Sequence, residues 1–171
     1  MKRILLWSLF AITPLLAFAE DVKATIKQQA QSCAKALLAS DYDGVVKYTH
    51  PRVVSLVGGK EAMVAVLKRG TAQMRADGIS FEDASVGTPE EPKKIATWLT
   101  SVVPQHIVMK VPGGHLHQDA FLLGISEDDG KNWVFLDLGP ITKAQFAQVF
   151  PELESQVPLP EKKKPVFKKD E

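Results

Sequence analysis

Cysteine is almost absent from this chain, which has a single one, Cys33, among 171 residues. One thiol cannot close a disulfide within the chain, so packing must stabilise the fold. Cys33 falls in register with Ile26, Ala30 and Leu37 on one helical stripe, and free cysteine is among the residue types most often buried. We therefore expect Cys33 to be a small buried hydrophobic residue and not a reactive thiol.

An excess of charge of one sign is also lacking, because the chain has 21 basic and 20 acidic residues. Two of the basic residues lie in the first 19, so the remaining 152 residues carry 19 against 20. A nucleic-acid-binding surface needs clustered basic charge to displace counterions from phosphates, so we expect no nucleic-acid partner. That length, with 45% apolar residues in the whole chain, suits one globular domain with one core.

The motifs that mark many enzyme classes are missing as well. The sequence contains no Gly-rich phosphate loop, no nucleophile elbow, no Cys-x-x-Cys pair, no acidic calcium loop and no internal repeat. We therefore predict no cofactor, and composition alone names no reaction.

Residues 1–19 are typical of a secretory signal peptide. Lys2 and Arg3 precede an apolar stretch over 4–16, and a small-x-small tripeptide ends at Ala19. The stretch is shorter than the roughly 18 to 20 residues needed to span a bilayer, which favours cleavage after Ala19 over an uncleaved anchor. We predict a periplasmic or secreted protein with no stable membrane anchor after cleavage.

Helical spacing dominates the first half of the rest of the chain. Apolar residues recur every three or four positions over 21–40, a short helix is expected over 45–49, and a third over Lys60–Asp77. Gly78 is placed as a C-terminal stop. The third helix has one apolar side, which we expect to be packed: Met63, Val66, Leu67, Gly70 and Met74.

After Gly78 the pattern changes from helical to alternating, which predicts strands. A long strand over 95–111 contains Pro104, which lacks a backbone donor and therefore implies an edge position, a bulge or a bend. Strands over 115–126 and 131–138 would complete a meander.

Two features close the chain. Thr142 and Gln145 have the spacing of a capping box, which predicts a short helix. Residues 154–171 are rich in proline and lysine, and we predict a flexible tail with no fixed structure at its end. The predicted organisation is a signal peptide over 1–19, a single domain over 20–153 and this tail.

The segments DYDGVVKYTHPRVVSLVGGKEAMVAVL and SEDDGKNWVFLDLG, with helices before a bent meander, resemble the nuclear transport factor 2-like (cystatin-like cone) superfamily. The resemblance covers roughly residues 22–153 and suggests an uncharacterised exported bacterial branch. It implies an α+β fold whose N-terminal helices pack on the concave face of a strongly bent antiparallel sheet, a cone with an internal cavity. The superfamily includes isomerases, dehydratases, cyclases, ligand binders and interaction domains, so function must be argued from residues.

His115, His117 and Asp119 alternate along one predicted strand, so their side chains share one face. His-x-His with a nearby carboxylate is a workable metal-ligand spacing. The sequence identifies no fourth ligand, however, and a solvated or hydrogen-bonded strand end is the simpler interpretation. We predict no metal site and keep these three residues as the candidates for one.

Asp137 is the first candidate for general acid-base catalysis, and Asp119 is the second. Alternation aligns Asp137 with Trp133 and Phe135, and burial of that face would raise its pKa. The simpler interpretation is a strand-end aspartate that accepts backbone hydrogen bonds before Gly139.

Four rings are candidates for ligand binding. Phe121 continues the face of His117 and Asp119 toward an apolar end, as in a strand that lines a cavity from mouth to base. Tyr48, Trp98 and His106 are polar-tipped rings in apolar surroundings, and each could equally pack at a core edge.

We expect an exported, non-catalytic module that binds a small apolar or amphipathic ligand or a protein partner. The alternative is a cavity enzyme of the isomerase or dehydratase type that uses general acid-base catalysis, which needs two ionisable groups converging in one apolar pocket. A third option is a homodimer through the outer face of the sheet. The sequence leaves these options open.

Overall fold

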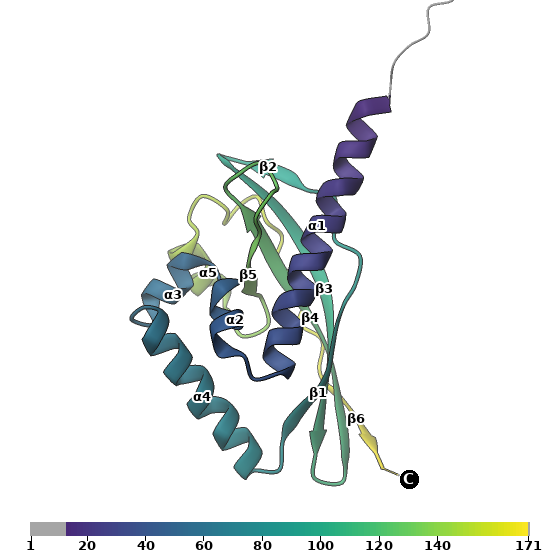
Figure 1. Ribbon diagram of the computed structural model, residues 1–171, viewed down its shortest axis with the longest axis vertical. Coiled ribbons are helices and arrows are strands. Elements are labelled where there is room, and N and C mark those ends of the chain that lie inside the picture. The colour runs from purple at the N-terminus through teal and green to yellow at the C-terminus, as the bar shows by residue number, and fades with distance from the viewer. Residues whose placement is uncertain (1–12, 171) are drawn as a thin grey trace, which may run out of the picture.

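The computed structural model describes residues 13–170 as five helices and one six-stranded antiparallel sheet, which confirms the predicted α+β class (Figure 1). Residues 1–12 of the predicted signal peptide lie outside this range, and 13–19 belong to the first helix. Along the described chain, no helix has both the length and the apolar character that a bilayer crossing needs. The elements are α1 (Thr13–Leu38), α2 (Tyr42–Lys47), α3 (Pro51–Leu56), α4 (Lys60–Ala76), β1 (Ser80–Val86), β2 (Lys93–Ile95), β3 (Trp98–Val111), β4 (Gly114–Ser126), β5 (Val134–Asp137), α5 (Lys143–Val149) and β6 (Val166–Lys169).

The sheet is built around the long hairpin of β3 and β4, which pair in register from Leu99 with Ser126 to Val111 with Gly114. β1 and β2 pair with the outer edge of β3. The outer edge of β4 carries two strands, β5 on residues 122–125 and β6 on residues 114–117. Residues 118–121 of β4 therefore pair with no strand of the described chain on that edge, where the Leu138 N–H donates to the Phe121 carbonyl at 2.9 Å.

Pro104 occupies the kind of position predicted for it. On one side, Pro104 pairs with Phe121 of β4. On the other side, β1 ends opposite Gln105, and the Gly87 N–H donates to the Pro104 carbonyl at 2.8 Å. Because no strand residue faces Pro104 on that side, the missing N–H leaves no ladder bond unmade.

One face of the sheet packs against α1. Val103 and Leu122 are register partners, so they point to the same face, where they join Trp133 and Phe135 in a buried cluster. The buried residues of α1 in this cluster follow helical spacing: Val22, Ile26, Ala30 and Ala34. The N-terminal helix is thus fixed by its small apolar stripe, and half-buried Cys33 packs at its margin.

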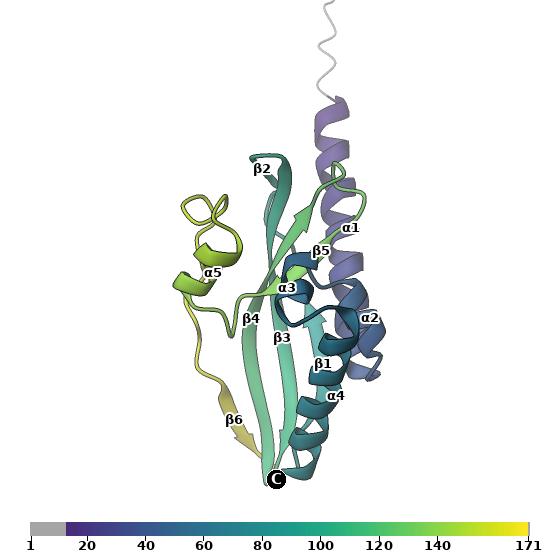
Figure 2. The same cartoon turned by 90° about the vertical axis from the view of Figure 1, so that its left-hand side faces the viewer.

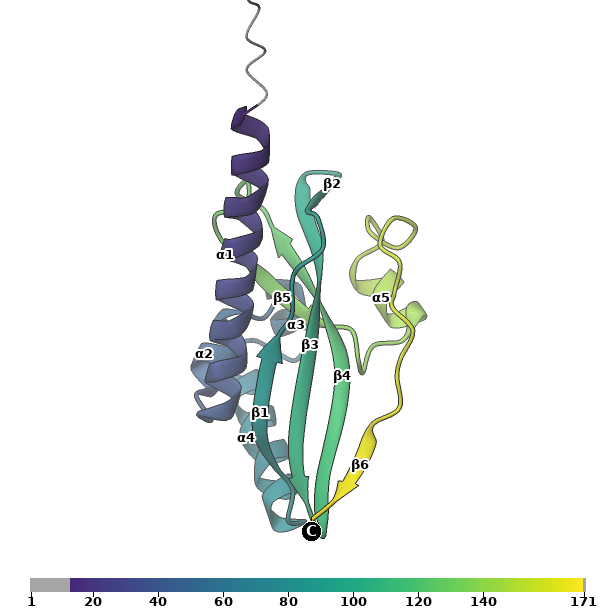
Figure 3. The same ribbon diagram turned by 90° about the vertical axis from the view of Figure 1, so that its right-hand side faces the viewer.

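The opposite face packs against α5 and the segment after it, and Figure 3 shows α1 and α5 on opposite sides of the sheet. Val102 and Leu123 point to this second face. They meet the buried side chains Phe146, Phe150, Leu153 and Val157. The predicted capping box at the start of α5 is present, since Thr142 and Gln145 exchange hydrogen bonds.

Two expectations were wrong. Part of the tail is ordered: Val157 is buried, and residues 166–169 form β6 because the edge of β4 offers unpaired backbone groups to an alternating segment. The third helix is present as α4 and ends before Gly78, whose φ is +74°, but none of its residues is buried. Val66 is 50% exposed because α4 packs along α2 and not across the sheet.

Candidate functional site

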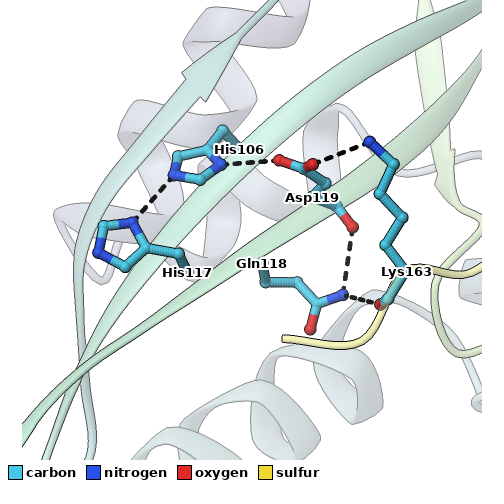
Figure 4. Close-up of polar contacts among 5 residues, drawn as sticks. All are labelled: His106, His117, Gln118, Asp119 and Lys163. Atoms are coloured by element: carbon cyan, nitrogen blue, oxygen red, sulfur yellow. Dashed lines mark hydrogen bonds and ion pairs between the residues drawn. The ribbon is translucent and has the colours of Figure 1, made fainter. Parts of the chain in front are cut away.

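A polar cluster is formed by His106 of β3, by His117 and Asp119 of β4, and by Lys163 of the C-terminal segment (Figure 4). His106 and Asp119 are register partners, so their side chains share a face, and Asp119 Oδ1 lies 2.9 Å from His106 Nδ1. His106 Nε2 lies 3.3 Å from His117 Nδ1. Lys163, from the segment before β6, donates to Asp119 Oδ2 at 3.0 Å. We call these four residues the histidine–aspartate cluster.

The charges of the cluster fix its proton arrangement. Hydrogen bonds from His106 and Lys163 lower the pKa of Asp119, so the carboxylate is ionised at neutral pH and can only accept. His106 therefore holds a proton on Nδ1. Loss of hydration, with the positive charge of Lys168, lowers the pKa of His117. The contact between His106 Nε2 and His117 Nδ1 links the two rings, so a chain of hydrogen bonds connects His117 through His106 to Asp119.

A hollow of about 340 Å³ lies beside the cluster, where β4 lacks a partner strand. We call it the β4 hollow. Its walls are residues 118–121 of β4, the turn over 137–140 and the segment over 160–163, which runs between α5 and β6 in Figure 2. Its apolar lining is Ile107, Ala120, Phe121, Leu138, Pro140 and Pro160, and its ionisable lining is Asp119, Asp137, Glu161, Lys162 and Lys163.

A second hollow of about 430 Å³ adjoins the β4 hollow. It is lined by the end of β1 and by Pro104, Gln105 and His106 of β3. Asp119, Ala120, Phe121 and Lys163 line both hollows. The Asp119–Lys163 ion pair therefore belongs to both linings.

The C-terminal segment is held over β4 by side-chain contacts. Besides the ion pair with Asp119, the Lys163 carbonyl accepts from Gln118 Nε2 at 3.3 Å. Lys162 Nζ donates to the carbonyl of Ile141 at 2.9 Å. These contacts make residues of the predicted tail part of the site.

Asp137 ends β5 and lines the β4 hollow. Its Oδ1 accepts from the Gly139 N–H at 2.8 Å, the backbone bond expected of a strand-end aspartate. The surrounding chain removes part of the hydration of the carboxylate and raises its pKa. Burial, followed by the negative charge of Asp137, raises the pKa of Cys33 to about 11, so the thiol stays protonated at neutral pH.

The three candidates for a metal site do not converge. His115 contacts Glu82 at 2.9 Å and Asp170 at 3.0 Å, whereas His117 and Asp119 contact His106. No set of three or more His, Cys, Asp or Glu side chains within residues 21–170 is arranged to hold a metal ion.

Two of the candidate rings lie away from both hollows. Trp98 is buried edge-on to Phe150, with the Arg52 guanidinium 4.8 Å from its ring centre. Tyr48 is half-buried beside the apolar cluster between α1 and the sheet, and its carbonyl accepts from the Phe135 N–H at 2.7 Å. Both pack at core edges, whereas His106 and Phe121 line hollows.

His50 is a polar-tipped ring that, like Tyr48, was expected to pack at a core edge, and it was not among the candidate site residues. It is 2% exposed, and its Nδ1 accepts from the Arg52 N–H at 3.1 Å at the start of α3. Its Nε2 is buried with no hydrogen-bond partner among the described residues. Burial, and then the charge of Arg52, lowers its pKa to about 4. Its place before Pro51, at the N-cap of a helix, was the available signal.

Comparison of the chain with protein-family models, with curated proteins and with solved structures gives no match. The arguments about function below therefore rest on the side chains and the hollows just described.

Proposed function

We propose that this protein is an exported, non-catalytic module that binds a small amphipathic molecule in the β4 hollow. One observation carries the proposal: the gap between β5 and β6 leaves a hollow of about 340 Å³ that both apolar and ionisable residues line. Its size falls in the range of about 300 to 1,000 Å³ that is usual for ligand pockets. Export rests on the pattern of residues 1–19.

We also propose that the fold is a cone of the nuclear transport factor 2-like type. Support comes from α1, which packs along β1 and one face of the sheet, and from the long antiparallel hairpin of β3 and β4. The second covered face, under α5, is an addition to the expected cone.

The non-catalytic assignment rests on how the ionisable groups are used. Both oxygens of Asp119 already accept from His106 and Lys163, so its negative charge is balanced within the protein. Such an arrangement supports shape and ligand orientation more directly than proton transfer.

The cavity enzyme remains a second candidate because of one specific feature. Asp119 orients His106 in the way that a carboxylate orients a catalytic imidazole, and Asp137, with its raised pKa, lies in the adjoining hollow. An enzyme would consume a compound from a mixture of envelope metabolites. Mass spectrometry would detect that loss with the native protein and not with His106→Gln.

The binding proposal is tested with 1-octanol as a neutral amphipathic probe, followed by amide chemical shifts in NMR. We expect shifts concentrated at residues 118–121 and 137–140. Ala120→Leu places a larger side chain in the hollow and should weaken octanol binding by about tenfold, because the added carbons take the probe's space. Ala72→Leu, on the exposed side of α4, is the matched control and should leave binding unchanged.

Two results would overturn the proposal: no localised shifts at millimolar octanol, or equal binding by native protein and Ala120→Leu. If Ala120→Leu does not fold, as judged by circular dichroism, Phe121→Ala removes part of the apolar wall and takes its place.

A further inference from the structure

The ionisable side chains of the β4 hollow are unequally satisfied. Lys163 is paired with Asp119, and Lys162 donates to the Ile141 carbonyl. Three carboxylates, those of Asp119, Asp137 and Glu161, share the lining with these two ammonium groups. The lining therefore has one more negative charge than positive, and both lysines already have acceptors.

Of the three carboxylates in the lining, Glu161 forms no hydrogen bond or ion pair with other described residues, and Asp137 forms a single hydrogen bond. Its Oδ1 accepts one backbone N–H, from Gly139, and no hydrogen bond reaches its Oδ2 within residues 13–170. No lysine or arginine forms an ion pair with it in that range, although Lys162 is close enough to act on it through space. On the α1 side its neighbour is the Cys33 thiol, which is neutral. Asp137, which is exposed at the end of β5, thus lines the hollow as a carboxylate with no bonded cation among the described residues.

The rest of the hollow suits an aliphatic stem. Ile107, Ala120 and Phe121 come from the β3–β4 hairpin, and Leu138, Pro140 and Pro160 come from the two segments beside it. A molecule with a cationic head and an apolar stem fits both parts of the lining. The head would pair with the Asp137 carboxylate, and the stem would cover the apolar side chains.

We propose that the β4 hollow selects primary amines with a short apolar stem, with the ammonium group hydrogen-bonded to Asp137 Oδ2. The stem lies against Ile107 and Ala120, which line the hollow on the same face of the sheet as Asp137. This inference rests on the proposed function, since it names the ligand class of the same hollow. It adds a role for Asp137 as the residue that determines the charge preference.

The test compares three probes of equal chain length, octylammonium, 1-octanol and octanoate, binding to the full chain at pH 7 by calorimetry. We expect octylammonium to bind at least about tenfold tighter than octanol, and octanoate weaker than both. Asp137→Asn keeps an oxygen for the Gly139 N–H but removes the charge. In this variant octylammonium should bind no tighter than octanol, and octanol binding should be unchanged.

Asp129→Asn is the matched control. Asp129 is exposed with φ of +57°, a backbone conformation that asparagine tolerates, and it does not line the hollow. This variant should bind all three probes as the native protein does. Should Asp137→Asn fail to fold, salt gives the second readout: 0.5 M NaCl should weaken octylammonium binding and not octanol binding.

The outcomes separate the two proposals. Equal binding of all three probes at the hollow would overturn the amine preference and leave the binding function standing, whereas binding of none would overturn both. Tightest binding of octanoate would assign the charge preference to the lysines. Loss of octylammonium binding in Asp119→Asn but not in Asp137→Asn would place the ammonium group on Asp119; either result overturns the role of Asp137.

Discussion

The two ends of the β3–β4 hairpin differ in how their residues are covered. At the covered end, residues 98–104 and 121–126, α1 packs on one face and α5 on the other, and most side chains are buried. At the open end, residues 105–111 and 114–120, most side chains are only half-buried, and the histidine–aspartate cluster lies there. Buried side chains are therefore concentrated at one end of the hairpin, and the histidine–aspartate cluster lies at the other.

The largest expected effect on stability comes from replacing a leucine by alanine at each end of β4 and comparing the two losses. Leu123 is fully buried, so Leu123→Ala should lower the free energy of unfolding by about 2–5 kcal/mol through lost burial and a cavity. Leu116 is half-buried, so Leu116→Ala should cost about 1 kcal/mol. Urea denaturation of both variants measures the contrast, and equal losses would contradict it.

A smaller effect comes from pH at the covered end, through His50. In the unfolded chain His50 takes up a proton near its ordinary pKa of about 6.5, whereas in the folded protein it does so only near its lowered pKa of about 4. The free energy of unfolding should therefore fall as pH drops from about 6.5 to about 4. Allowing for screening, we expect a loss of about 2 kcal/mol.

Substitutions identify the group responsible. His50→Asn keeps an acceptor for the Arg52 N–H at the helix start but does not titrate, so its unfolding midpoint should depend less on pH in this window. His117→Gln, at the open end, is the control and should keep most of the dependence. A native pH profile that stays flat between pH 6.5 and 4 would refute the assignment.

The smallest effect on stability is expected from removing β6, which pairs with β4 at the open end. All four residues of β6 are exposed, including Val166 at 57% and Phe167 at 52%. Ending the chain after Pro165 should lower the free energy of unfolding by about 1 kcal/mol or less, because little apolar surface is covered there. Thermal unfolding of the shortened chain measures this, and a loss of several kcal/mol would show that the open end also stabilises the fold.

Local patterns in the sequence predicted most of the elements. Helical spacing gave α1 and α4, the capping-box residue Thr142 gave α5, and alternation gave the meander with Pro104 at a locally unpaired position. Each of these depends on residues close together in the chain, which is why single-sequence reasoning finds them.

The site was less predictable because it depends on contacts between distant segments. Asp119 and His106 were candidates, but their pairing follows from the β3–β4 register, and Lys163 lay in a segment expected to have no fixed structure. The stripe on α4 shows the same limit, because an amphipathic pattern does not reveal whether a partner covers it. The β4 hollow arises from where β5 and β6 each stop, which no local pattern encodes.

The placement of residues 160–163 against β4 has a practical consequence for handling the protein. During synthesis residues 160–163 leave the ribosome after the helices and the β3–β4 hairpin, so a chain cut before residue 160 has those elements and still lacks one wall of the hollow. A carboxypeptidase that trims past Lys163, or a bulky affinity handle fused to the C-terminus, would act on the same wall. Purification handles are better removed from that terminus before any ligand screen.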